Sequence, residues 1–162
     1  EDWMTGMQSR EPFENLLAEI PKTMNEHKDI LLVFMDIDYL RRINNDFGRA
    51  AGDEVIVAAA RCIENVFGAI GKCYRTGGDE FAVLAMRKTE HAGKSPSVRL
   101  KEVLDRYNNR RKQPYPLSIS IGQAEYKEGE TLDIKDLLTQ ADKNMCKISQ
   151  NKKGKTPNGC ND

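Results

Sequence analysis

Hydrophobic positions in the first half of the chain predict a helix, a strand and two further helices. Apolar residues recur at helical spacing over 10–20. The run ILLVFMDID, residues 30–38, is almost continuously apolar and rich in strand formers, which is typical of a central strand covered on both faces. Residues 39–48 and 52–68 return to helical spacing, and Asp53 is a natural N-cap for the second of these helices.

The second half of the chain predicts a hairpin followed by a helix, a strand and a final helix. Two short strands flank Gly77-Gly78, a pair that favours a two-residue turn with φ > 0 at both positions. The later elements are predicted at 98–112, 116–126 and 134–147. The resulting order, α-β-α-α-β-β-α-β-α, matches the split βαβ layout of ferredoxin-like folds. We therefore expect an α+β domain with a mostly antiparallel sheet and helices packed over it.

Composition limits the classes of protein that need consideration. The 162 residues fit one domain, and Lys+Arg balance Asp+Glu at 25 each, so no overall field favours nucleic acid or membrane binding. No apolar run approaches the ~20 residues of a membrane span. Two histidines and four cysteines without ligand spacing disfavour zinc. We expect a cytoplasmic domain without direct membrane contact, although segments outside this sequence could tether it to a membrane.

Candidate chemistry gathers where the predicted hairpin meets the end of the first strand. The stretch RTGGDEFAVLAM places Asp79 and Glu80 directly after the two glycines, and a solvated hairpin is the alternative explanation. Asp36 and Asp38 lie two residues apart at the end of the first strand and so share a face. If the hairpin packs beside that strand, Asp79 lies near Asp36, and two carboxylates plus nucleotide phosphates are a usual Mg²⁺ site. For Asp38, a helix cap is the favoured role.

Four sequence blocks resemble those of the GGDEF domain family, the diguanylate cyclases. They are DWMTGMQSR at 2–10, DIDYLRRINNDFGRAAGD at 36–53, RTGGDEF at 75–81 and ADKNMCKIS at 141–149. The resemblance covers nearly the whole chain. We expect residues 1–150 to form the GGDEF domain and residues 151–162 to form a flexible polar tail.

The resemblance implies a role for each candidate residue. Mg²⁺ or Mn²⁺ would be held by Asp36, Asp79 and the carbonyl of Ile37, while Glu80 would orient or deprotonate the attacking hydroxyl. Without side chains, Gly77 and Gly78 let the backbone approach the substrate closely. The remaining substrate contacts would come from Leu40, Arg41, Asn44, Asp53 and Lys153. For Glu80, a salt bridge to Arg75 or to a neighbouring lysine is the alternative.

Within that group, Asn44 and Asp53 match the pair that reads guanine in the family. Arg41 stands where the family usually has a lysine that meets the triphosphate, and Leu40 stands where it has phenylalanine. Ser149 replaces a phosphate-contacting lysine, and the lysines at 152, 153 and 155 are candidates to replace it.

The implied reaction condenses two GTP molecules into cyclic di-GMP and releases pyrophosphate. It requires two such domains face to face, so we expect a homodimer that acts as the output domain of a larger bacterial signalling protein with an upstream sensory domain. The alternative is a catalytically weak or inactive GTP-binding regulatory module. A nucleotide cyclase of the adenylate type is disfavoured by Asn44, Asp53 and the hairpin motif. Gly68 and Gly71 occupy the positions of the family's Arg-x-x-Asp product-inhibition motif.

Overall fold

The computed structural model describes residues 1–20, 29–86, 95–131 and 133–153. The order of the elements is the predicted one. They are α1 (Arg10–Glu19), β1 (Ile30–Ile37), α2 (Leu40–Phe47), α3 (Arg49–Phe67), β2 (Lys72–Arg75), β3 (Glu80–Ala85), α4 (Pro96–Arg110), β4 (Ile119–Tyr126) and α5 (Ile134–Lys153).

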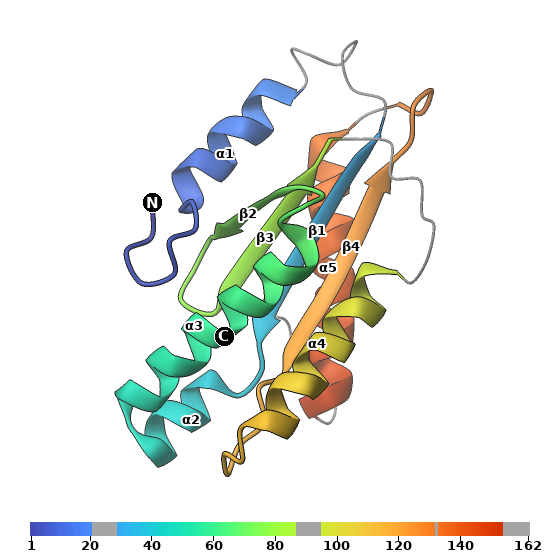
Figure 1. The fold of residues 1–162 in the computed structure, drawn as a ribbon. Coiled ribbons are helices and arrows are strands. Elements are labelled where there is room, and N and C mark those ends of the chain that lie inside the picture. The colour runs from blue at the N-terminus through green and yellow to red at the C-terminus, as the bar shows by residue number, and fades with distance from the viewer. Residues whose placement is uncertain (21–28, 87–94, 132, 154–162) are drawn as a thin grey trace.

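The four strands of the described residues form one sheet in the order β2-β3-β1-β4, and each neighbouring pair is antiparallel. Figure 1 shows α3 and α4 in front of this sheet and α5 behind it. The predicted split βαβ fold, an α+β architecture, is confirmed. It places the end of β1 beside the start of β3 at one edge of the sheet.

Strand β1 is central and separates two hydrophobic cores. Alternate residues such as Leu31 and Val33 pack in the core beneath α3 and α4, whereas Ile30 and Leu32 pack in the core beneath α1 and α5. Both faces of the strand are therefore covered, which explains the continuous apolar run in its sequence. The same alternation directs Asp36 and Asp38 toward the α5 side of the sheet.

The two predicted acidic helix caps are wrong. Helix α3 begins at Arg49, directly after Gly48, whose φ of 92° interrupts the helical path from α2. Asp53 therefore lies inside the helix rather than at its start. The N-cap of α2 is Tyr39, in the left-handed conformation with φ 63°. Asp38 instead turns its carboxylate toward β4.

Helix α5 is longer than predicted and runs to Lys153, past the expected domain boundary at residue 150. Met145 and Ser149 are both buried and lie one turn apart, so the helix continues along the sheet although its sequence turns polar. The rest of the predicted tail, 154–162, lies outside the described residues. No helix in the described parts of the chain is long and apolar enough to span a bilayer.

Candidate active site

The hairpin between β2 and β3 packs against the end of β1, as predicted. The backbone N–H of Ile37 donates to the carbonyl oxygen of Asp79 over 2.9 Å. One residue earlier, Asp36 is paired across the strands with Glu80. The turn's two acids therefore lie beside the last two residues of β1.

This arrangement has the chemistry of a Mg²⁺ site. Asp36 and Asp79 are half-buried, and Glu80, which lies on the same face of the sheet as Asp36, is exposed. Within the described residues no group of three or more His, Cys, Asp or Glu side chains is arranged to hold a metal. Mg²⁺ is commonly bound through one or two carboxylates plus substrate phosphates, so the two carboxylates and the Ile37 carbonyl fit this ion.

The turn itself differs from the predicted two-residue form. Four residues, 76–79, separate the strands, and the N–H groups of Thr76 and Gly77 both reach the carbonyl oxygen of Glu80. Neither Gly77 nor Gly78 has a positive φ, so left-handed conformation does not explain the glycines. A Cβ added at Gly78 would meet no atom within 4 Å. The turn thus leaves open space beside Asp79, where a substrate can approach the backbone.

An ion pair that the sequence interpretation missed braces the turn. Arg75 donates to Asp2 over 3.0 Å, with side-chain exposures of only 13% and 16%, and also donates to the carbonyl oxygen of Gly78. Burial alone would raise the pKa of Asp2, but hydrogen bonds from Thr5 and the Arg75 guanidinium outweigh it and lower that pKa. Both residues lie inside the motif blocks at 2–10 and 75–81, and this was the feature of the sequence that could have pointed to the contact. The expected alternative partner of Arg75, Glu80, is not its partner.

The two predicted guanine-reading residues lie on α2 and α3. Asn44 is half-buried, and its Oδ1 atom is buried without a hydrogen-bond partner among the described residues. Gly52 faces it so closely that an added Cβ would collide with the Asn44 side chain. Asp53 follows directly on α3 and is also half-buried. An orphaned buried acceptor such as Asn44 Oδ1 is an opening for a ligand's N–H donor.

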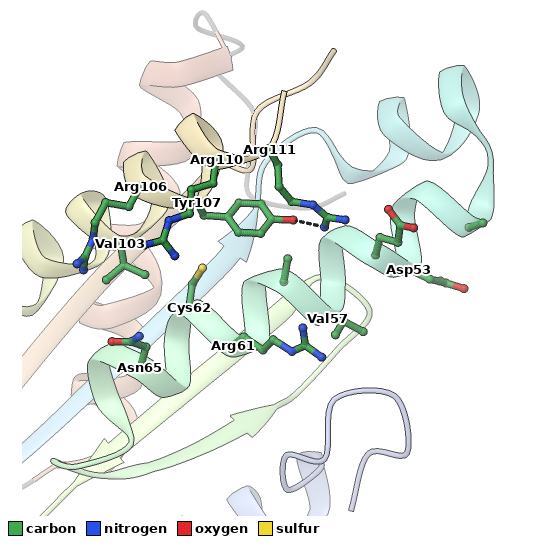
Figure 2. A pocket seen from close by; sticks show the side chains of 13 residues that line it. Asp53, Val57, Arg61, Cys62, Asn65, Val103, Arg106, Tyr107, Arg110 and Arg111 are labelled. Carbon is green, nitrogen blue, oxygen red and sulfur yellow. Dashed lines mark hydrogen bonds between the residues drawn. The ribbon is translucent and has the colours of Figure 1, made fainter. Parts of the chain in front are cut away.

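Asp53 also lies at one end of a groove of about 960 Å³ between α3 and α4 (Figure 2). Arg61, Arg106, Arg110 and Arg111 line this groove. Asp36, Asp79 and Glu80 do not line it. The groove is therefore separate from the acidic residues at the end of β1.

The predicted phosphate contacts lie at the N-terminus of α2 and the C-terminus of α5. Leu40 and Arg41 form the first turn of α2, and the Arg41 side chain is exposed. A helix N-terminus with a neighbouring cation suits a phosphate. Lys153 is the last described residue of α5, and its neighbour Lys152 bonds to Asp38. Ser149 is 6% exposed.

Comparison with known proteins defines the class to which this fold and site belong. The family model "Diguanylate cyclase, GGDEF domain" matches residues 1–155. The chain belongs to the GGDEF domain family. The crystal structure of the GGDEF domain of DgcB from Caulobacter crescentus, in complex with c-di-GMP, is 25% identical with a TM-score of 0.73, covering 95% of this chain and 91% of that one.

Curated relatives carry two different activities in their names. "Probable diguanylate cyclase DgcC" of Escherichia coli (strain K12) is 32% identical over 124 residues, or 76% of this chain and 33% of that protein. "Cyclic di-GMP phosphodiesterase PdeB" of Shewanella oneidensis is 26% identical over 147 residues, 87% of this chain but 16% of that protein. The chain thus spans a third or less of the length of these two relatives.

Proposed function

We propose that this domain is a diguanylate cyclase that condenses two GTP molecules into cyclic di-GMP. The observation that carries the proposal is the hydrogen bond from Ile37 N–H to the Asp79 carbonyl, which sets the acidic turn against the end of β1. Membership of the GGDEF family supports the same activity.

The reaction is two successive phosphoryl transfers. In the first, the 3′-hydroxyl oxygen of one GTP bonds to the α-phosphorus of the other, and the bond from that phosphorus to the pyrophosphate oxygen breaks, which leaves a linear dinucleotide. The hydroxyl proton passes to a base, for which Glu80 is the proposed acceptor because it is exposed and lies opposite Asp36. In the second, the remaining 3′-hydroxyl of this linear dinucleotide attacks its remaining α-phosphorus, releases the second pyrophosphate and closes the ring. The two nucleotides therefore have to face each other, each held by one copy of the domain.

The remaining proposed roles rest on the resemblance to the family and on the elements that carry these residues. Asp36, Asp79 and the Ile37 carbonyl would hold Mg²⁺ or Mn²⁺, which when bound neutralises charge developing on the phosphoryl oxygens. Arg41 would add a cation at the triphosphate, aided by Leu40 at the start of α2 and by Lys153. Gly77 and Gly78 would leave room for the ribose and α-phosphate. Asn44 and Asp53 would bind guanine.

The test uses a domain dimerised by a leucine zipper fused to its N-terminus, incubated with GTP and Mg²⁺. Chromatography should detect cyclic di-GMP and two equivalents of pyrophosphate. Asp79→Ala should abolish turnover yet leave the melting temperature nearly unchanged, because the Asp79 side chain makes no hydrogen bond or ion pair within the described residues. The exposed Asp105→Ala on α4 is the matched control. Retained turnover in Asp79→Ala, or a large fall in its melting temperature, would contradict the assigned role.

A second candidate is a GTP-binding regulatory module without turnover. Burial of Ser149, where the resemblance places a phosphate-contacting lysine, favours it, as does the PdeB relative, whose name assigns a different activity to the whole protein. The same assay separates the two candidates. A regulatory module would bind GTP in calorimetry but release no pyrophosphate from the forced dimer.

A further inference from the structure

Asp38 is a buried carboxylate that the proposed reaction does not use. Its side chain is 1% exposed, and each of its oxygens accepts a short hydrogen bond. Ser118 Oγ donates to Oδ2 and Ser120 Oγ donates to Oδ1, each over 2.6 Å. Burying a charge is costly unless it is both hydrogen-bonded and paired with an opposite charge.

Lys152 supplies that opposite charge from the far end of the chain. Its ammonium donates to Asp38 Oδ2 over 2.9 Å and to the carbonyl oxygen of Ile119 over 2.8 Å. The carbonyl oxygen of Lys152 in turn accepts from the Tyr39 hydroxyl over 2.9 Å. One residue near the end of α5 therefore joins the segment between β1 and α2 to β4.

These contacts act on the segment that carries the proposed substrate site. Asp38 stands one residue after Ile37 and two after Asp36, and Leu40 begins α2 two residues later. The backbone N–H of Asp38 also donates to the carbonyl oxygen of Ser118 over 2.8 Å. Any shift of Asp38 therefore moves the proposed metal ligands on one side and the start of α2 on the other.

We infer that Lys152 is a positioning residue for the proposed metal and triphosphate site, acting through Asp38. The inference rests on the proposed function. Removing the ammonium leaves the buried Asp38 carboxylate without a cation, and the end of β1 must move or admit water to solvate it. Residues that hold ligands in place typically change metal affinity about tenfold to a hundredfold when they are lost.

Most of helix α5 is held on the sheet by residues other than Lys152. Helix α5 is anchored on the sheet by buried residues well before its end, among them Leu137, Ala141 and Met145. The Lys152 side chain is 36% exposed, so a methionine there retains most of the aliphatic stem and removes only the charge. Because an unpaired buried carboxylate is costly, we expect Lys152→Met to lower the melting temperature, while the domain stays folded at the temperature of the binding assay.

The experiment compares Lys152→Met, Lys152→Arg and the control Lys147→Met, an exposed lysine on the same helix. Calorimetry with a non-hydrolysable GTP analogue at several Mg²⁺ concentrations gives a readout independent of turnover. Lys152→Met should weaken analogue binding about tenfold or more and raise the Mg²⁺ concentration needed. In turnover by the forced dimer, the KM for GTP should rise more than kcat falls. Lys152→Arg should restore most of the affinity and of the melting temperature, and Lys147→Met should match the wild type in both.

If the wild-type domain binds the analogue and Lys152→Met binds it with the same affinity and the same Mg²⁺ dependence, this inference is overturned and the proposed function is not. Circular dichroism showing that Lys152→Met is unfolded at the temperature of the binding assay would also overturn it, because the role would then be structural. A wild-type domain that bound no analogue would overturn the proposed function and this inference with it.

Discussion

At the scale of single residues, the position of the Asn44 side chain depends on Gly52, because only a residue without a side chain leaves room for it. Guanine offers N1–H and N2–H donors, which Asp53 can accept, and the buried Oδ1 of Asn44 can engage the same base. Adenine presents an acceptor at N1 instead, which would face the carboxylate unmatched. An unmatched buried polar group costs about 1–3 kcal/mol, or roughly tenfold to over a hundredfold in affinity.

Gly52→Ala separates helix stability from base recognition. Alanine is better than glycine inside a helix by roughly 0.5–1 kcal/mol, so the variant should melt at the wild-type temperature or slightly above it. The new Cβ would collide with the Asn44 side chain, which must rotate away. We expect GTP affinity to fall about tenfold or more, with little change in the weaker affinity for ATP. Calorimetry with both nucleotides measures this.

Asn44→Ala is the matched control, because it removes the amide that Gly52→Ala displaces. The double variant should lose no more affinity than either single variant, since both act on one contact. Wild-type GTP affinity in Gly52→Ala, or equal affinity of the unaltered domain for ATP and GTP, would rule out this pair as base readers.

At the scale of elements, the N-terminal loop is tied to the acidic turn through Arg75. The guanidinium bonds Asp2 on one side and the carbonyl oxygen of Gly78 on the other, and the N–H of Arg75 donates to Gln8. The position of the turn beside β1 thus depends partly on residues that precede α1.

Acid should remove the stability that this ion pair contributes. The folded pKa of Asp2 lies below its ordinary value of 3.8, so its contribution is fully present above that value and is lost as the pH falls through the folded pKa. In thermal melts from pH 7 down to pH 2.5, Asp2→Asn should melt below the wild type by a constant difference above about pH 5. This difference in melting temperature should shrink below about pH 4. Asp105→Asn, exposed on α4, is the control. If the difference in melting temperature between Asp2→Asn and the wild type stayed the same at the lowest pH, the charge of Asp2 would not contribute to stability.

At the scale of the whole molecule, the connection from α3 to β2 carries none of the groups that a product-inhibition site of the Arg-x-x-Asp type requires. Gly68 caps α3, and Gly71 is packed so that an added Cβ would lie 2.8 Å from the carbonyl oxygen of Leu84. Glycine offers neither an arginine fork nor a carboxylate to the phosphates and guanine edges of cyclic di-GMP.

We therefore expect no inhibition of the activated dimer through this turn. Cyclic di-GMP titrated at saturating GTP should leave the initial rate unchanged, whereas competition at the active site would appear only at low GTP. Ala69→Glu, between the two glycines, tests the turn directly. Strong non-competitive inhibition in the unaltered dimer that disappeared in Ala69→Glu would refute the prediction. Without inhibition at this turn, we propose that control acts on the association of the two domains.

Much of the fold followed from local patterns in the sequence. The order of elements and the doubly covered β1 each depend on residues close together in the chain or on alternation along a strand. The pairing of the hairpin with β1 joins residues far apart in the chain and was expected from the split βαβ layout. The element ends were less predictable. Asp53 and Asp38 resembled caps because Asp often caps helices, but Gly48 and Tyr39 determine where α3 and α2 begin.

The sequence by itself determined which residues stand at the end of β1 and in the turn, and hence the class of chemistry. Only the tertiary structure decided how those residues are held. Lys152 and Asp38 are 114 positions apart, and Arg75 and Asp2 are 73 apart, so neither contact has a local signal. A charge pattern shows that partners exist, but it does not show which side chains meet. That depends on the packing of α5 and the N-terminal loop against the sheet, where burial makes each unpaired charge costly.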